Sequence, residues 1–389
     1  MEKHRSWYKK LACAILLIGF SISAAFADSS ATVSLDQKIG QMIMIGFDGT
    51  TLTPQSPVMA DIQNQRIGGV VLFDYNMKTK DFHKNIENPA QLSVLTQQLQ
   101  TATQRYQPST YPLFIAIDAE GGNVNRLKPV YGFPKMISAK MLGKLPVAFT
   151  YYYAGRLMKT LNATGINLDF APVIDLDLNP NSSIIGKVER SFSDNPMHVV
   201  NRAEIFSKFF KHHHILCAYK HFPGLGNISD NPHDDMVDET ATWHTQELLP
   251  YEKLFANPNA CSLVMVSHVI NNQLDPDHYP ASLSHKMITS TLRDQLHFNG
   301  VVITDDMQMG AIIKHYGLEK AIRLSINAGA DIILFGNQLQ YQPDIAQQVI
   351  QIVKTDIQKG LISEKRIDES YVRIMKAKAM LPQPNVNLS

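Results

Sequence analysis

Three apolar runs of this 389-residue chain end in ionisable side chains. Asp118 closes the first run, Lys220 and His221 close the second, and Asp305 and Asp306 close the third. A carboxylate can act as a nucleophile or a base, and lysine or histidine can bind an anion or transfer a proton. Two adjacent acids of an extended chain point in opposite directions, so we expect only one acid of the last pair to face inward.

Further polar residues lie just beyond such runs. Arg126 follows a double glycine, which lets the backbone approach a ligand closely. Arg190 suits either a clamp on a substrate oxygen or a salt bridge at the start of an exposed helix, and the residue pattern leaves both open. Asp175 and Asp177 are more typical of structural carboxylates. His233 stands in a polar stretch, where a lone histidine is usually only solvated.

Eight short β-type runs alternate with helical stretches. Their apolar residues are nearly continuous, as in parallel strands that are covered on both faces. The expected strands are Gln41–Phe47, Gly68–Phe73, Pro112–Asp118, Ile166–Val173, Ile215–Phe222, Ser262–Val269, Gly300–Asp306 and Ala330–Phe335. The expected helices are Pro89–Tyr106, Val147–Asn162, Pro196–His213, Thr245–Phe255, Ser284–Leu296, Leu318–Ala328 and a terminal helical pair.

This alternation predicts an α/β fold, a (β/α)8 TIM-type barrel that forms a single domain over residues 28–389. An open doubly wound sheet is the alternative, but that fold usually has a glycine-rich phosphate loop after its first strand, and Phe47-Asp48-Gly49-Thr50 stands there instead. In a β/α barrel the carboxyl ends of the strands carry the chemistry. The polar residues described above would therefore meet at one end of the barrel.

Composition excludes several classes of protein. Hydrophobic residues make up 44% of the chain and charged residues 18%, with a formal net charge of +1, which is ordinary for a globular protein. Lysine and arginine are scattered and are not interleaved with stacking aromatics, so we expect no nucleic-acid partner. Three consecutive histidines, 212–214, end an expected helix, where imidazoles complement the negative helix end, and we expect no metal there.

The first 27 residues have the pattern of a signal peptide. Lysines and an arginine precede an apolar run, and Ala25 and Ala27 frame an A-x-A cleavage site before Asp28. An uncleaved membrane anchor is the alternative, and Cys13 lies too early in the run for a lipoprotein. We expect export to the periplasm or the medium, with no membrane association after cleavage. For the two remaining cysteines, Cys217 and Cys261, we expect buried thiols, although a disulfide is possible in an oxidising compartment.

Several of these segments together resemble the β-N-acetylhexosaminidases of glycoside hydrolase family 3. The strongest likeness is Lys220 to Gly226 followed by His233, Val237-Asp238-Glu239-Thr240 and Trp243. Asp118 to Arg126 is similar to the family's acid-x-Glu-Gly-Gly segment, Ile184 to Phe192 to its Ile-Gly-x-Arg-Ser-Phe loop, and Thr304 to Met307 to its nucleophile motif. The motifs keep the family's order and span most of the chain after residue 27.

The resemblance implies a retaining mechanism. Asp305 would attack the anomeric carbon and form a covalent glycosyl-enzyme, while His233 would protonate the leaving oxygen and later deprotonate water. It also implies that a set of charged residues grips the sugar hydroxyls and the acetamido group. These residues are Asp118, Arg126, Arg190, Lys220 and His221.

The chain departs from the family pattern at two places. It has Gly224-Leu225-Gly226 where the family usually has Gly-His-Gly, and Asn231-Pro232-His233 where the family usually has Asp-Ser-His or Asp-Thr-His. The missing aspartate normally holds the imidazole. Weaker acid catalysis is one hypothesis, and replacement of that aspartate by Asp230 is another.

The family also contains β-glucosidases, which resemble longer proteins whose acid/base residue comes from a second domain. His233 therefore favours the hexosaminidase branch, with N-acetylglucosamine-containing oligosaccharides from peptidoglycan fragments or chitin as substrates. We expect a monomer without a cofactor or metal. Two alternatives remain: an inactive sugar-binding barrel, suggested by Asn231, and Schiff-base chemistry at Lys220.

Overall fold

The computed structural model describes residues 33–107, 111–229, 231–232, 234–338 and 340–383. The described residues from Leu35 onward form one compact unit. The expected signal peptide, Asp230 and His233 lie outside the described residues. Within the part that is described, no helix is long and apolar enough to cross a bilayer.

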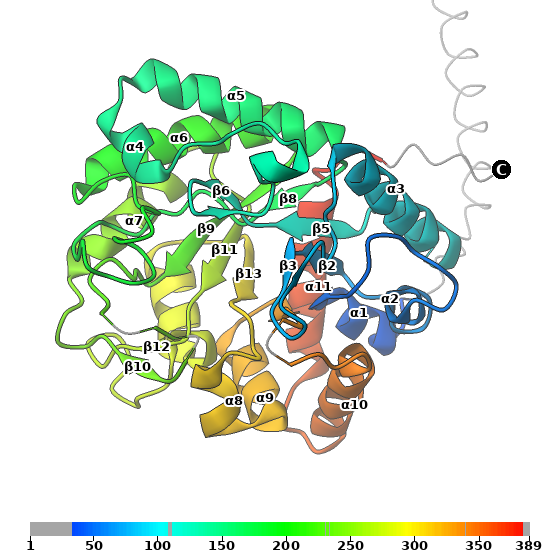
Figure 1. Ribbon diagram of the computed structural model, residues 1–389. Coiled ribbons are helices and arrows are strands. Elements are labelled where there is room, and N and C mark those ends of the chain that lie inside the picture. The colour runs from blue at the N-terminus through cyan, green and yellow to red at the C-terminus, as the bar shows by residue number, and fades with distance from the viewer. Residues whose placement is uncertain (1–32, 108–110, 230, 233, 339, 384–389) are drawn as a thin grey trace, which may run out of the picture. The chain divides into compact units, whose positions relative to one another are not determined.

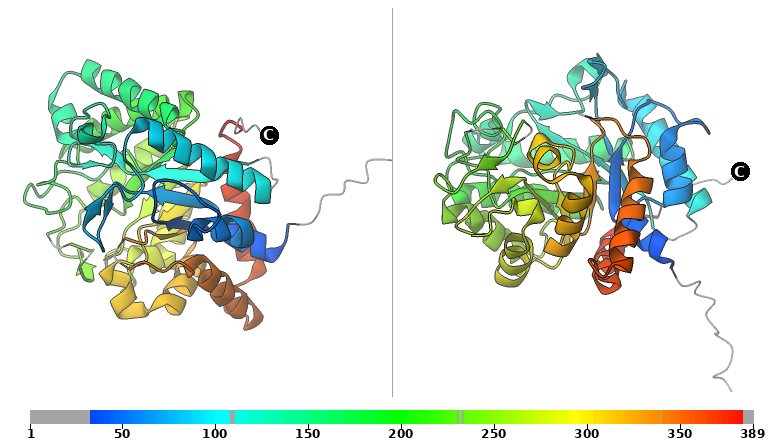
Figure 2. Two further views of the ribbon diagram at one scale, coloured as in Figure 1. Left: turned by 45° about the vertical axis from the view of Figure 1, so that its right-hand side comes forward. Right: turned by 90° about the horizontal axis from the view of Figure 1, so that it is seen from below.

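Eight parallel strands form the central sheet (Figure 1). They are β1 (Ile43–Gly46), β2 (Gly69–Leu72), β5 (Phe114–Ile117), β8 (Leu168–Asp169), β9 (Leu216–Phe222), β11 (Leu263–Val266), β13 (Val301–Thr304) and β14 (Ile333–Phe335). Each lies inside one of the eight runs predicted from the sequence. The helices surround these strands in the further views as well (Figure 2).

The order of the strands rules out the open doubly wound alternative. The ladder runs β13-β11-β9-β8-β5-β2-β1-β14, so the first strand pairs with the last. A parallel bridge between Ile303 and Ile332 joins the two ends of the ladder. The sheet is thus a nearly closed barrel, and the expected fold class is confirmed. Its interior belongs to one apolar core that extends to the surrounding helices.

The main helices begin and end where local residues dictate. They are α1 (Leu35–Gln41), α3 (Pro89–Tyr106), α5 (Val147–Ala163), α6 (Pro196–His212), α7 (Leu249–Phe255), α9 (Leu318–Ala328), α10 (Ile345–Gln358) and α11 (Glu364–Lys378). Asn88 and Asn195 cap α3 and α6 from the position before an N-terminal proline, and Gly329 ends α9 in a left-handed conformation. The expected helix Ser284–Leu296 is instead a π-helix, Lys286–Gln295.

Short elements complete the chain. They are α2 (Pro57–Ala60), the hairpins β3–β4 (Tyr75–Asn76 and Asp81–Phe82) and β6–β7 (Ala119–Gly121 and Val124–Asn125), α4 (Ala139–Lys144), β10 (Val237–Asp238), the 3-10 helix Thr245–Leu248, β12 (Val269–Ile270) and α8 (Gly310–Tyr316). Both hairpins follow barrel strands directly, so they stand at the carboxyl end of the barrel.

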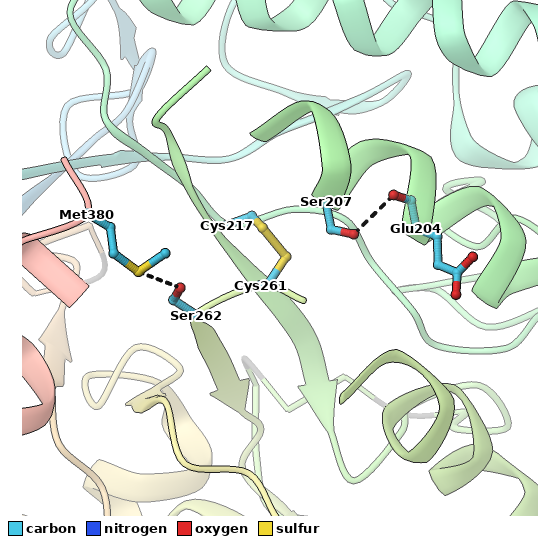
Figure 3. The surroundings of a disulfide bond; sticks show 6 residues. All are labelled: Glu204, Ser207, Cys217, Cys261, Ser262 and Met380. Carbon is cyan, nitrogen blue, oxygen red and sulfur yellow. Dashed lines mark hydrogen bonds between the residues drawn. A yellow bond between two sulfur atoms is a disulfide. The ribbon is translucent and has the colours of Figure 1, made fainter. Parts of the chain in front are cut away.

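The expectation of two free thiols is wrong. Cys217 at the start of β9 and Cys261 just before β11 form a disulfide (Figure 3). Both residues are buried, as the sequence indicated. The two neighbouring strands bring their amino ends together, and the sequence conceals this proximity because the two cysteines are 44 positions apart.

Candidate active site

A cavity of about 370 Å³ opens at the carboxyl end of the barrel, which is a size typical of small-molecule sites. Loops after five of the strands contribute to its wall, and β9 and β11 contribute residues of the strands themselves. The polar residues that line it are Asp118, Arg126, Arg190, Lys220, His221, Asp305, Asp306 and Gln338, and apolar residues such as Phe73, Phe170 and Met265 complete the wall.

A network of charged side chains forms one side of this cavity. Lys220 Nζ lies 2.7 Å from Asp118 Oδ1 and 2.6 Å from Glu120 Oε1. Arg190 donates from Nε and Nη2 to the two oxygens of Glu120, at 2.7 Å each. Arg126 Nη2 approaches Asp118 Oδ2 at 3.5 Å. Residues from β6, β9 and two loops therefore hold one another in place with alternating charge.

The charges of this network are mutually stabilised. Burial alone would raise the pKa values of Asp118 and Glu120, but the neighbouring cations outweigh it and lower both pKa values. Burial alone would lower the pKa of Lys220, and the two carboxylates raise it instead. Both acids and the lysine are therefore ionised at neutral pH. The lysine is 1% exposed, yet it borders the cavity.

His221 connects this network to a second carboxylate. Asp175 Oδ2 lies 2.7 Å from His221 Nδ1, and the Asp175 carboxylate also accepts the backbone N–H groups of His221 and Leu225. Arg190 Nη2 lies 3.0 Å from His221 Nε2. Since a guanidinium can only donate, Nε2 must accept and Nδ1 must carry the proton. His221 is thus held as the neutral Nδ1–H tautomer.

Asp305 and Asp306 border the other side of the cavity. Asp305 Oδ1 accepts the N–H of Asp306 at 2.8 Å, and Asp306 Oδ1 accepts the N–H groups of Gln308 and Gly336 at 3.0 Å. Burial raises the pKa of Asp306 to about 6 despite these two bonds, which lower it, and the neighbouring charge of Asp305 adds a smaller rise. Both residues line the cavity, and the Asp306 carboxylate is bonded to the loop after β14. The expectation that only one of the two carboxylates faces inward stays a prediction.

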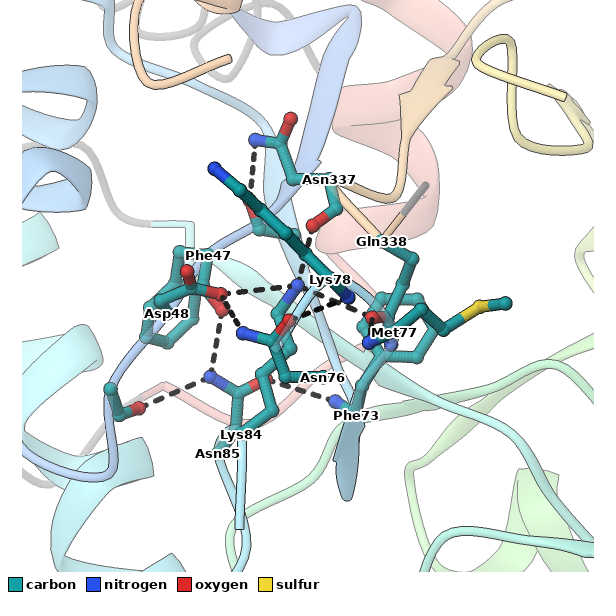
Figure 4. A network of polar contacts seen from close by, with 12 residues as sticks. Phe47, Asp48, Phe73, Asn76, Met77, Lys78, Lys84, Asn85, Asn337 and Gln338 are labelled. Carbon is teal, nitrogen blue, oxygen red and sulfur yellow. Dashed lines mark hydrogen bonds and ion pairs between the residues drawn. The ribbon is translucent and has the colours of Figure 1, made fainter. Parts of the chain in front are cut away.

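A buried lysine, Lys84, connects the loops that form the rim of the cavity beside Asp306 (Figure 4). Lys84 Nζ donates to the carbonyl of Asn337 at 2.5 Å and lies 3.2 Å from Asp48, while Gln338 Nε2 donates to the carbonyl of Tyr75 at 3.0 Å. These contacts tie the loops after β1, β2 and β14 together. Phe73 is flanked by the cations of Lys84 and Arg126, at 5.6 and 5.4 Å from its ring centre.

The polypeptide that leaves β9 is fixed at both ends of its described course. Near β9 the N–H of Gly226 donates to Glu247 Oε2 at 2.7 Å, and at the far end Lys314 of α8 donates to the carbonyl of Asp234. Leu225, which replaces the family's usual histidine, is buried in a small apolar cluster. Asp230 and His233 belong to this stretch, but they are not among the residues that the structure describes.

Comparison with known proteins agrees with this geometry. The sequence profile of the glycosyl hydrolase family 3 N terminal domain matches residues 34–377. The chain belongs to glycosyl hydrolase family 3.

Relatives within family 3 cover most of the chain. Beta-hexosaminidase A of Pseudoalteromonas piscicida is 30% identical over 96% of this chain, which spans 65% of the length of that relative. A beta-hexosaminidase of Xylella fastidiosa strain M23 is 31% identical over 75% of this chain and 82% of its own. The crystal structure of a beta-N-acetylhexosaminidase from Beutenbergia cavernae is 28% identical, with a TM-score of 0.78 over 90% of this chain and 99% of its own.

The structure places most of the predicted family 3 site residues together. Six of them line one cavity: Asp118, Arg126, Arg190, Lys220, His221 and Asp305. The alternative for Arg190, a salt bridge at an exposed helix start, is wrong, because its ionic partner is the buried carboxylate of Glu120 and the next helix begins six residues later. Among the described residues, no group of three or more His, Cys, Asp or Glu could hold a metal ion.

Sequence reasoning gave no role to several residues that support this site. Glu120 joins Arg190 to Lys220, Asp175 fixes His221, and His268 Nε2 lies 3.0 Å from the carbonyl of Asp306. Glu120 belongs to the segment Asp118 to Arg126, which resembles family 3. Its position in that segment could have indicated a role in the site. Asp175 and His268 meet their partners because the strands before them pair with neighbours, β8 with β9 and β11 with β13.

Proposed function

We propose that this protein is a retaining β-N-acetylhexosaminidase that releases terminal N-acetylglucosamine from oligosaccharides through a glycosyl-Asp305 intermediate. One observation carries the proposal. A carboxylate suited to be the nucleophile and a buried network of charged hydrogen-bonding groups line the same cavity of about 370 Å³. Membership of family 3 supports the same reaction class, hydrolysis of a glycosidic bond.

Asp305 suits the role of nucleophile because of its position. It follows β13 at the carboxyl end of the barrel, opposite β5, which precedes Asp118, in the order of the strands. Attack by its carboxylate on the anomeric carbon breaks the bond to the leaving oxygen and inverts C1. Attack by water then breaks the glycosyl-Asp305 bond and inverts C1 again, so the configuration is retained.

The proton for the leaving oxygen would come from His233, and Asp230 is our candidate for the carboxylate that orients its imidazole. In the second step the same imidazole would accept a proton from the attacking water. His221 does not suit this role in the observed arrangement, because its Nε2 accepts from Arg190 and its Nδ1–H is engaged by Asp175.

The charged network would bind the glycone. Asp118 can accept from sugar hydroxyls, and Arg126, Arg190 and Lys220 can donate to hydroxyl or acetamido oxygens. His221 would hold Arg190 in position by accepting from Nη2. Because these groups are already paired with one another, little reorganisation is needed when a sugar enters.

We further propose that residues 1–27 are a cleaved signal peptide and that the mature protein works outside the cytoplasm as a monomer. The disulfide between Cys217 and Cys261 supports an oxidising compartment. Peptidoglycan fragments and chito-oligosaccharides are the substrates that an exported enzyme of this type would meet.

The test uses 4-nitrophenyl N-acetyl-β-glucosaminide with the mature protein and its Asp305→Ala variant. We expect release of 4-nitrophenol by the unmodified protein and a fall in kcat of about 10⁴-fold or more in the variant, because the covalent route is lost. Equal release by both proteins contradicts the assignment of Asp305. Release by neither identifies a sugar-binding barrel without activity.

A trapped intermediate gives a second, independent test. A 5-fluoro derivative of N-acetylglucosaminyl fluoride retains the acetamido group and slows hydrolysis of the intermediate. Mass spectrometry of the digested protein should place the sugar on the peptide that contains Asp305. A label on any other residue overturns the assignment.

A further inference from the structure

We propose that Glu247 is a positioning residue for the acid step, because it fixes the root of the polypeptide that leads from β9 to residue 233. The inference rests on the proposed function, since it assumes that protonation of the leaving oxygen depends on this stretch. Glu247 is not among the described residues that line the cavity. Its effect would therefore be exerted through the backbone of Gly224–Gly226.

Two buried carboxyl groups hold that short turn. Asp175 accepts the N–H groups of His221 and Leu225, and Glu247 Oε2 accepts the next N–H, that of Gly226, at 2.7 Å. The Asp175 bonds hold the side of the turn that joins the sugar-binding residue His221. The Glu247 bond holds the side from which the chain continues toward residue 233.

Both glycines of the turn are required by the side chain of Glu247. Gly224 has a φ of +124°, and a Cβ there would lie 2.7 Å from both Cβ and Oε2 of Glu247. A Cβ on Gly226 would lie 2.9 Å from Glu247 Oε2 and 2.4 Å from the carbonyl oxygen of Leu176. The turn therefore lies directly against the carboxyl group, with no space for a side chain between them.

Two backbone groups offset the burial of the Glu247 carboxyl. Glu247 lies in the 3-10 helix Thr245–Leu248 and is 2% exposed. Burial, and then the charge of Asp175, raise its pKa to about 8, whereas hydrogen bonds to the backbone of Gly226 and, less strongly, of His244 lower it. His244 is the N-cap of the same 3-10 helix, so this weaker bond is local. The stronger bond, to Gly226, is the one that joins Glu247 to the turn after β9.

The far end of the same stretch has separate anchors. Lys314 of α8 donates to the carbonyl of Asp234, and His315 Nε2 lies 2.6 Å from Asp235 Oδ1. These contacts lie on the exposed surface, whereas the contact of Glu247 is buried. The root at Gly226 is therefore the firmer of the two attachments and sets the direction in which the chain departs from β9.

The experiment compares two substrates that differ in their need for an acid. Chitobiose has a poor leaving group, whereas 2,4-dinitrophenyl N-acetyl-β-glucosaminide needs little protonation. Glu247→Met keeps the volume of the side chain and removes the acceptor. We expect kcat to fall about 100-fold on chitobiose and less than about 5-fold on the dinitrophenyl substrate, which is the pattern of a weakened general acid.

Two control variants separate positioning from general damage. Glu247→Gln retains a carbonyl that accepts from Gly226, so it should restore kcat on chitobiose to within about 5-fold of the unmodified enzyme. Asp356→Asn changes another buried acid, which pairs with Arg323 of α9 and not with the turn, and it should show no selectivity between the two substrates. Equal losses on both substrates in Glu247→Met, or failure of glutamine to rescue, overturn the proposal.

A second variant covers the case in which Glu247→Met does not fold. Gly224→Ala displaces the same carboxyl group through its added Cβ and should produce the same selective loss on chitobiose. Failure of the proposed function is recognised separately. If Asp305→Ala keeps its activity on both substrates, the hydrolase assignment fails, whereas an inactive Asp305→Ala with unselective Glu247 variants rejects only the role of Glu247.

Discussion

Two buried ionic networks lie at opposite ends of this barrel, and only the one at the carboxyl end borders the cavity that Asp305 lines. At the carboxyl end Lys220, Asp118, Glu120 and Arg190 line or support the proposed sugar site. At the amino end, just before β14, Asp331 accepts from the side chains of three arginines and a serine and from one backbone amide. These donors are Arg293, Arg366, Arg373, Ser370 and the N–H of Val302.

The comparison shows that a buried ion network is not by itself a functional site. The guanidiniums beside Asp331 outweigh its burial and lower the pKa of this carboxyl, just as Lys220 and Arg126 lower that of Asp118. The difference lies in what each network faces. Asp331 is enclosed by its donors, whereas Lys220 has two acceptors for its three N–H groups and borders open space. The first arrangement stabilises the fold, and the second remains able to bind a ligand.

Among changes to the two networks, Lys220→Met should have the largest effect, and that effect is on activity. The change leaves Asp118 and Glu120 without the cation between them, so a sugar would meet negative charge that Arg126 and Arg190 balance only in part. We expect kcat/KM on 4-nitrophenyl N-acetyl-β-glucosaminide to fall about 10³-fold, or about 4 kcal/mol of transition-state stabilisation. Steady-state kinetics on folded protein measure this value. A loss below 10-fold would place Lys220 with the structural network of Asp331.

The matched change at the other end is Asp331→Ala. It leaves three arginines without their shared acceptor, and because these arginines are partly exposed we expect a loss of about 3 kcal/mol, at the lower end for a broken buried pair. Urea unfolding measures it. The kcat/KM of the folded variant should be unchanged, and a fall comparable to that of Lys220→Met contradicts the distinction between the two networks.

A smaller effect is expected from Arg190→Lys. Lysine keeps the charge but cannot bond both oxygens of Glu120 and also reach His221 Nε2. We expect kcat/KM to fall about 30-fold, or about 2 kcal/mol. The melting temperature should change by only a few degrees. Arg366→Lys is the control at the Asp331 network, and it should leave kcat/KM unaltered.

The smallest effect is a pH dependence that has opposite signs at the two ends. The pKa of Asp306 is raised from 3.8 to about 6, so the folded state holds its proton more tightly than the unfolded state. The stabilising contribution of this group is therefore present below about pH 4 and is lost as pH rises through 6. The pKa of Asp331 is lowered, so its contribution is present above about pH 4 and is lost as pH falls.

The measurement is the difference in unfolding free energy between the unmodified protein and Asp306→Asn across pH 4 to 7. Asparagine still accepts from the N–H groups of Gln308 and Gly336, so the difference isolates the ionisation of the carboxyl. We expect the difference to shift in favour of Asp306→Asn as pH rises. A difference that stays constant across this range shows that Asp306 is not the titrating group.

Local sequence determined the elements of the barrel. The eight apolar runs became its eight strands, and α3 and α9 lie within the predicted limits because an asparagine with proline begins one and a glycine ends the other. The sequence could not show that Lys286–Gln295 is a π-helix and not an α-helix. The wider helical turn follows from tertiary packing and not from a distinct residue pattern.

The sequence also determined which polar residues meet, because the carboxyl ends of parallel strands share one end of a barrel. Asp118, Lys220 and Asp305 were predicted together for this reason. Tertiary structure alone decided which groups pair within that end. Glu120 bonds Arg190 across 70 residues, Asp175 bonds His221 across 46, and Cys217 bonds Cys261 across 44. Such pairs depend on side-chain distances of a few ångströms, which are set by the packing of the closed barrel and leave no periodic signal in the chain.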